Sequence, residues 1–158
     1  MLSHVENGMP AMVDVGGKTA TRRTATARAL VEFPAEVMTE LKRTAPENDL
    51  AGPKGPVFAT AVIAGVQAAK RTWELIPLCH PLPLDGIQIA CAIQGNSVEV
   101  TCTAKAFHTT GVEMEALTGA SVAALTLYDM TKALSHAIVI REVALVVKTG
   151  GKSDYAAP

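Results

Sequence analysis

The feature that most limits the possible folds is a two-residue turn between two alternating segments. Gly95-Asn96 separates residues 86–94 from residues 97–105, and apolar residues recur at every second position of both segments. A Gly-Asn pair in this setting is typical of a tight β-hairpin. One face of the first segment would carry Ile87, Ile89, Cys91 and Ile93. The other face carries alanines, so both faces are apolar and a second packed layer is expected.

The segments around this hairpin alternate between strand and helix patterns. Strands are expected at residues 23–33, 86–94, 97–105 and 138–147, and helices at 35–43, at 57–72 and from Gly111 to about Ser135. The helix at 57–72 has a ridge of small side chains that favours close packing, formed by Val57, Ala61, Gly65 and Ala69. This order predicts an α+β fold of the ferredoxin-like type. It would have a split β-α-β antiparallel sheet with helices on one face.

The 158 residues are enough for one domain. We expect a mobile N-terminal arm at residues 1–20, a single ferredoxin-like domain at 21–150 and a flexible C-terminal tail at 151–158. The first ten residues lack the basic and apolar pattern of a signal peptide. The three cysteines form no CxxC pair, which is typical of a reducing compartment. We therefore expect a cytoplasmic protein.

Charge and hydropathy narrow the range of partners. The chain has 14 Lys and Arg residues against 15 Asp and Glu residues, which argues against a general nucleic-acid binder. The longest apolar stretch, Val57 to Val66, is interrupted by Thr60 and is too short to span a membrane. Charged residues make up only 18% of the chain, against about 25% in typical domains. This deficit predicts that part of the surface meets another copy of the chain.

The long helix near the C-terminus carries charges at both of its ends. Glu113 and Glu115 stand at its start, where acidic residues also simply complement the helix dipole. Asp129 stands near the opposite end, where a carboxylate is unfavourable unless Lys132 pairs with it. The two ends would lie about 28 Å apart in a continuous helix. If both ends are functional, the site must be built between two subunits.

Loops and the first strand carry further candidate residues. Cys79-His80 lies between prolines in a segment that cannot form regular structure, and Lys54 lies in the glycine- and proline-rich loop GPKGP. Each of these residues is also compatible with a purely structural or solvated role. A basic stretch that would suit a phosphate group contains Lys18, Arg22, Arg23 and Arg28. Paired glycines follow Lys148 and could hold an anion through backbone N–H groups. No cysteine or histidine has zinc-ligand spacing, so no metal site is predicted.

Several long strings in this chain resemble the cyclic pyranopterin monophosphate synthase family of molybdenum cofactor biosynthesis. They are MVDVGGK at 12–18, TRRTATARALV at 21–31, KGPVFATAVIAGVQAAKRTWELIPLCHPL at 54–82, TGVEMEALTGASVAALTLYDMTKA at 110–133 and KTGGKS at 148–153. The resemblance implies an enzyme that converts 3′,8-cyclo-7,8-dihydro-GTP to cyclic pyranopterin monophosphate with release of pyrophosphate. It also implies a homohexamer, a trimer of dimers, with sites at the dimer interfaces.

The resemblance also assigns roles to individual residues. Lys54 and Lys132 would act as general acid and base, with Asp129 as the carboxylate beside Lys132. A lysine whose pKa is lowered can serve in this way near pH 7. The residues expected to bind the nucleotide substrate are Lys18, Arg23, Cys79, His80, Glu113, Glu115 and Lys148. No cofactor is required, although Mg²⁺ carried by the substrate is compatible with a pyrophosphate leaving group.

Two positions depart from the family pattern. Pro56 stands where an acidic residue is frequent, which removes a possible partner of Lys54. Thr109 stands where a basic residue is frequent, which removes a substrate-binding cation or leaves its role to His108. One alternative is a non-catalytic nucleotide- or pterin-binding assembly subunit with the same fold. Another is a nucleotide-binding regulator.

Overall fold

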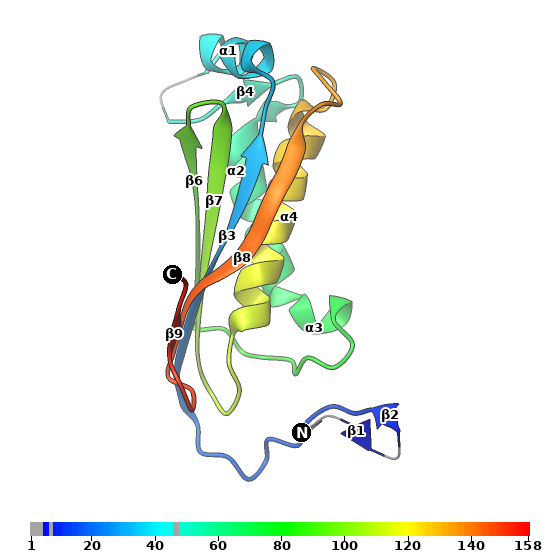
Figure 1. Ribbon diagram of the computed structural model, residues 1–158, viewed down its shortest axis with the longest axis vertical. Coiled ribbons are helices and arrows are strands. Elements are labelled where there is room, and N and C mark those ends of the chain that lie inside the picture. The colour runs from blue at the N-terminus through cyan, green and yellow to red at the C-terminus, as the bar shows by residue number, and fades with distance from the viewer. Residues whose placement is uncertain (1–4, 7, 46–47) are drawn as a thin grey trace.

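The computed structural model describes residues 5–6, 8–45 and 48–158, with side chains from Gly8 onward. Five strands form one antiparallel sheet in the order β6-β7-β3-β8-β9 (Figure 1). These strands are β3 (Thr21–Glu32), β6 (Gly86–Gln94), β7 (Ser97–His108), β8 (Val139–Thr149) and β9 (Tyr155–Ala156). The helices are α1 (Ala35–Arg43), α2 (Val57–Lys70), α3 (Thr72–Leu75) and α4 (Glu113–Thr131). Short hairpins pair β1 (Val5–Glu6) with β2 (Met9–Pro10) and β4 (Ala51–Gly52) with β5 (Gly55–Pro56).

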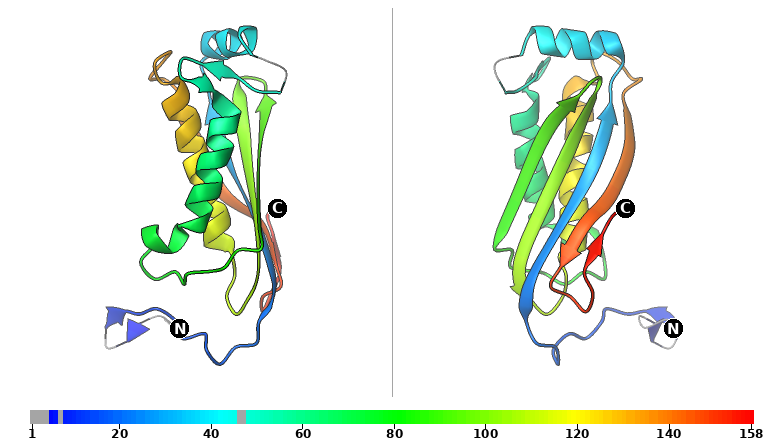
Figure 2. Two further views of the ribbon diagram at one scale, coloured as in Figure 1. Left: turned by 180° about the vertical axis from the view of Figure 1, so that it is seen from behind. Right: turned by 60° about the vertical axis from the view of Figure 1, so that its left-hand side comes forward.

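Helices α2 and α4 pack on one face of the sheet, as seen from behind in Figure 2. The predicted α+β fold is therefore confirmed as a five-stranded antiparallel sheet with helices packed on it. The predicted hairpin is also confirmed, because Gln94 pairs with Ser97 and Gly95 adopts a φ of 62°. Across the described ranges, no helix combines the length and the apolar character that crossing a membrane requires.

The core between the sheet and α4 is built from small side chains. Strand β3 buries Ala25, Ala27 and Ala29, and α4 buries Ala116, Ala120, Ala123 and Ala124. The predicted small-residue ridge of α2 is buried as well. A Cβ atom on Gly65 would lie 2.8 Å from the carbonyl oxygen of Gly119, so the two helices need glycine at this crossing. Small residues thus let the backbones of α2 and α4 approach closely.

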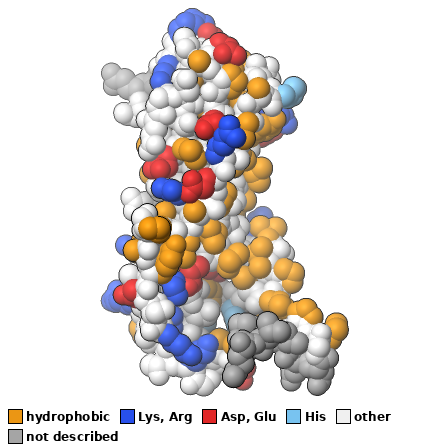
Figure 3. All heavy atoms as spheres, viewed as in Figure 1, with side chains coloured by type: hydrophobic (Ala, Val, Ile, Leu, Met, Phe, Trp, Pro, Cys, Tyr) orange, Lys and Arg blue, Asp and Glu red, His pale blue; other side chains and the backbone are white. Residues whose placement is uncertain are grey.

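The other face of the sheet carries no helix in Figures 1 and 2. Charged residues pair across its strands. Arg28 contacts Glu142 at 2.9 Å, and Arg141 contacts Glu32 at 2.6 Å. Figure 3 shows paired charges lying among hydrophobic side chains. Within the described residues no second layer covers this face, so the packed layer that the sequence led us to expect there stays a prediction.

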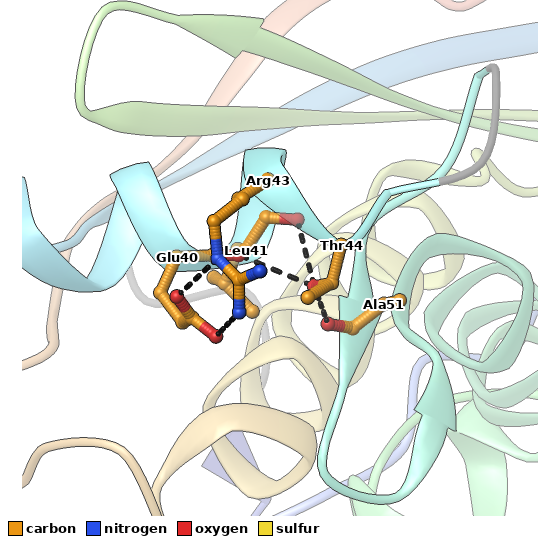
Figure 4. A network of polar contacts seen from close by, with 5 residues as sticks. All are labelled: Glu40, Leu41, Arg43, Thr44 and Ala51. Atoms are coloured by element: carbon orange, nitrogen blue, oxygen red, sulfur yellow. Dashed lines mark hydrogen bonds and ion pairs between the residues drawn. The ribbon is translucent and has the colours of Figure 1, made fainter.

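The C-terminal end of α1 is tied to strand β4 (Figure 4). The Thr44 hydroxyl donates to the carbonyl oxygen of Ala51 at 3.0 Å. Arg43 donates two hydrogen bonds to the Glu40 carboxylate, at 2.9 and 2.7 Å. The Thr44 hydrogen bond fixes the start of the β4–β5 hairpin relative to α1, whereas the Arg43–Glu40 pair lies within α1.

The end of the same hairpin is held by a carboxylate at the start of α2. Asp49 accepts hydrogen bonds from the backbone N–H groups of Phe58 at 2.7 Å and Ala59 at 3.1 Å. An acidic side chain at a helix N-terminus satisfies free N–H groups and complements the helix dipole. The hairpin between Asp49 and Phe58 is therefore anchored on both sides.

Some boundaries differ from those expected. The segment GPKGP, expected to be a loop, belongs to the β4–β5 hairpin, α2 ends at Lys70, and α4 spans Glu113–Thr131 rather than Gly111 to Ser135. Within the predicted C-terminal tail, β9 pairs with β8. Residues 1–4 and 7 of the predicted arm lie outside the described residues. The mobility of the arm and of the tail stays a prediction.

Candidate active site

Two groups of candidate residues lie at opposite ends of α4. The first joins the β4–β5 hairpin to the C-terminal end of the helix. Lys54 Nζ lies 2.7 Å from Asp129 Oδ2, and Lys132 Nζ lies 2.7 Å from Asp129 Oδ1. All three side chains are about half exposed. We call this group the lysine end of α4.

Close packing of the hairpin brings Lys54 to this position. A Cβ atom on Gly52 would lie 2.9 Å from the carbonyl oxygen of Met130, so glycine lets the hairpin touch the last turn of α4. Gly55 has a φ of 108°, which favours glycine at the turn after Lys54. Asp129 supplies the partner that Lys54 was expected to lose through Pro56. Gly52 thus serves contact with the helix, and Gly55 serves the turn after Lys54.

The ion pairs fix the protonation states at the lysine end. Hydrogen bonds from Lys132 and Lys54 lower the pKa of Asp129 to about 2. The hydrogen bond to Asp129 raises the pKa of Lys132 above its usual value. This direction is opposite to that of a lysine tuned as a base near pH 7. In the single chain, Lys132 carries a protonated ammonium group at neutral pH.

The second group surrounds a cavity of about 560 Å³ at the N-terminal end of α4. Five of the predicted substrate-binding residues line it, namely Lys18, Cys79, His80, Glu113 and Glu115. We call this group the carboxyl end of α4. Sequence reasoning missed other lining residues, among them Val13, Thr110 and Met114. The strings MVDVGGK and TGVEMEA contain all three, and these strings were the available signal.

Glu115 is the most unusual ionisable group at the carboxyl end. The residue is only 4% exposed to solvent. Burial raises the pKa of Glu115 to about 7, and the negative charge of Glu113 adds to this effect. A carboxyl group with such a pKa can hold or release a proton near neutral pH.

The neighbouring side chains complete the cavity. Burial, with a smaller contribution from the charge of Glu115, raises the pKa of the Cys79 thiol, so this thiol stays protonated. His80 Nε2 lies 2.8 Å from the carbonyl oxygen of Val13. Lys148 of β8 lies 3.4 Å from the Glu113 carboxylate, which links the sheet to the start of α4. Within the ranges described, no group of three or more His, Cys, Asp or Glu side chains is arranged to hold a metal ion.

Arg23 does not line the cavity. Its guanidinium donates to the carbonyl oxygens of His108 and Thr109, each at 3.3 Å, and thereby holds the turn that leads into α4. His108 is not among the lining residues either. The paired glycines after Lys148 were expected to be able to hold an anion. The N–H group of Gly150 donates to Asp154 Oδ1 at 3.1 Å, so a carboxylate of the same chain is bound there.

The two groups are not brought together within one chain. Helix α4 runs without interruption from Glu113 to Thr131. At about 1.5 Å per residue, Glu113 and Lys132 are separated by about 28 Å along its axis. One small ligand cannot contact both ends of the same helix.

The chain is similar to known proteins over almost its whole length. A model of the MoaC family matches residues 12–151. A cyclic pyranopterin monophosphate synthase of Xanthomonas oryzae pv. oryzae is 53% identical and covers 99% of this chain and 93% of its own length. The synthase of Novosphingobium aromaticivorans is 47% identical, over 96% of this chain and 94% of its own. Molybdenum cofactor biosynthesis protein 1 of Dictyostelium discoideum is 45% identical over 96% of this chain, which matches 26% of that protein. The chain therefore belongs to the MoaC family.

Proposed function

We propose that this protein is an enzyme that converts 3′,8-cyclo-7,8-dihydro-GTP to cyclic pyranopterin monophosphate and releases pyrophosphate. The proposal rests on family membership, on the names of relatives that cover almost the whole chain, and on the residues at the two ends of α4. The reaction would be an early step of molybdenum cofactor biosynthesis.

The observation that carries the proposal is the separation of two complementary groups along one helix. The lysine end offers two ammonium groups and a carboxylate, and the carboxyl end offers a cavity with Glu115 and His80. A reaction that rearranges a ring and forms a cyclic phosphate needs both proton transfer and positive charge near phosphate oxygens. Each end alone supplies only part of this set.

A site shared between two subunits would unite the two groups. The lysine end of one subunit would face the carboxyl end of its neighbour, with Lys54 and Lys132 as general acid and base and Asp129 holding both. Glu113, Glu115, His80, Cys79 and Lys18 would bind the substrate from the other subunit. Lys148 acts beside Glu113 in this scheme, and Arg23 acts by holding the turn before α4.

The assembly that we infer is a homohexamer of ferredoxin-like subunits, a trimer of dimers. The strand order β6-β7-β3-β8 supports the ferredoxin-like class, because β7 lies between the strands joined by the α2 crossover. Exposed apolar side chains on the helical layer support subunit contacts, including Ile63 and Leu125. The composition fits a cytoplasmic enzyme without nucleic-acid or membrane partners. Any Mg²⁺ in the reaction would be carried by the substrate's phosphates.

The test is a turnover assay with purified protein and 3′,8-cyclo-7,8-dihydro-GTP. Pyrophosphate and the oxidised, fluorescent pterin are both measured, for the parent, for Lys132→Ala and for Lys70→Ala. Lys70 is an exposed lysine on α2 and serves as the matched control. We expect Lys132→Ala to lose at least about a hundredfold in kcat, because it lacks a positioned proton donor. Lys70→Ala should match the parent.

Two results would oppose the proposal. A folded parent without turnover would favour the non-catalytic binding subunit, and substrate binding measured by calorimetry would then identify it. Undiminished turnover by Lys132→Ala would remove Lys132 from the chemistry.

A further inference from the structure

A short segment before the sheet, Ala11–Lys18, forms one wall of the cavity at the carboxyl end of α4. We call this segment the strap. Its lining residues are Ala11, Val13, Val15 and Lys18. In Figure 1 it continues from the lower end of β3 and passes beneath α3 and the adjoining loop. No residue from Gly8 to Ala20 belongs to the buried core. The strap therefore contributes no side chain to the hydrophobic core of the fold.

One hydrogen bond joins the strap to a predicted substrate-binding side chain. His80 Nε2 lies 2.8 Å from the carbonyl oxygen of Val13. A carbonyl oxygen can only accept a hydrogen bond, so Nε2 must carry the hydrogen. In the neutral ring, Nδ1 is then the only nitrogen with a free lone pair. The strap therefore selects one of the two neutral tautomers of His80.

Two further hydrogen bonds give the strap a defined shape. Asp14 Oδ1 accepts from the backbone N–H of Gly16 at 2.8 Å. The N–H of Lys18 donates to the carbonyl oxygen of Val15 at 3.1 Å. Together they fold residues 14–18 into a compact turn directly after Val13. Val13, which precedes the turn, and Lys18, which ends it, both line the cavity.

We propose that the strap is a positioning element that holds His80 as the Nε2–H tautomer, so that His80 accepts or donates its reactive proton at Nδ1 only. This inference rests on the proposed function insofar as His80 contacts the substrate. The Val13 carbonyl acts on the reaction through His80 and touches no reacting atom itself. The proposal also explains why a segment outside the core has an ordered turn at the edge of the cavity.

The first test compares two shortened chains with the parent. A chain lacking residues 2–16 loses the Val13 carbonyl, whereas a chain lacking residues 2–8 keeps the whole strap and serves as the control. Nitrogen-15 NMR of labelled histidines reports the tautomer, and His80→Gln identifies the His80 signals. We expect the parent and the control to show His80 with hydrogen on Nε2. The longer deletion should show exchange between both tautomers and a loss of about tenfold to a hundredfold in kcat.

The second test keeps the full chain and loosens only the turn. Asp14 is exposed and does not line the cavity, and Asp14→Ala removes the acceptor of the Gly16 N–H. Asp14→Asn keeps an acceptor oxygen at the same place. We expect Asp14→Ala to lose about tenfold in kcat with a mixed His80 tautomer. Asp14→Asn should restore both the tautomer and kcat.

Each outcome decides the proposal. An Nε2–H tautomer and a parental kcat in the folded chain lacking residues 2–16 would overturn it, as would identical effects of Asp14→Ala and Asp14→Asn. If the parent itself shows no turnover, the proposed function fails. In that case the tautomer measured by NMR still decides whether the strap controls His80.

Discussion

The two ends of α4 hold carboxyl groups whose protonation is controlled in opposite ways. Asp129 is half exposed, and its two lysine partners lower its pKa to about 2. Glu115 is buried beside a cavity, and loss of water raises its pKa to about 7. The same functional group is thus a permanent anion at one end and a titrating acid at the other. The difference shows that ion pairs and burial divide the chemical roles along a single helix.

Neither carboxyl group contributes much to the stability of the fold. Exposed ion pairs contribute at most about 1 kcal/mol to folding, so the lysine end is not explained by stability. A buried carboxyl group with a raised pKa opposes folding at neutral pH. Both arrangements are therefore better explained by a reaction than by the needs of the fold.

The largest expected effect on turnover follows from removing the Asp129 carboxylate, which is the permanent anion at the lysine end. Asp129→Asn removes the charge that raises the pKa of Lys132 and orients both lysines. We expect kcat to fall by about a hundredfold, because the positions of the proton donors are lost. The alkaline limb of the pH–rate profile should also move to lower pH. A parental profile would show that Asp129 does not control Lys132.

A smaller effect is expected from separating the hairpin from α4. Gly52→Ala places a Cβ atom against the Met130 carbonyl oxygen and should cost about 1 to 3 kcal/mol in free energy of unfolding. Turnover should also fall, since Lys54 moves away from Asp129. Gly86→Ala is the control, because a Cβ atom there meets nothing within 4 Å. Equal denaturation midpoints of the two variants would contradict the close contact.

The smallest effect concerns the pH dependence of stability at the carboxyl end. The folded-state pKa of Glu115 exceeds its unfolded value of 4.5, so the folded state binds more protons, and stability falls as pH rises from about 4.5 to about 7. Glu115→Gln should therefore raise the free energy of unfolding at pH 8 and change it little at pH 4. Urea titrations at both pH values measure this. A loss of stability at pH 8 would mean that the ionised carboxylate is favoured in the folded protein.

Local patterns account for the parts of the fold that could be predicted from sequence. The hairpin at Gly95-Asn96 and the pairing of Lys132 with Asp129 depend on neighbours within four residues. The length of α4, and hence the separation of its two ends, also follows from local helix periodicity. The resemblance to a family added the roles of residues that no local pattern explains.

Long-range contacts account for what could not be predicted. The β4–β5 hairpin lies in a segment whose glycines and prolines indicate only a loop, and its position depends on contact with Met130. Asp49 caps α2 across nine residues of chain, so no capping pattern identifies it. The contact of the strap with His80 spans 67 residues, so no local pattern indicates it. The hydrogen bonds from Arg23 to the carbonyl oxygens of His108 and Thr109 span 85 and 86 residues, and the role of Arg23 in binding phosphate stays a prediction.

The measurement that tests the shared site most directly is subunit complementation. Lys132→Ala and Glu115→Ala chains, each inactive alone, are mixed in equal amounts under conditions where subunit exchange is verified by mass spectrometry. A mixed dimer has one site with both substitutions and one intact site, so random mixing should restore about a quarter of parental turnover. Recovery near this level is the result that the shared site predicts. Verified exchange without any recovery would contradict it.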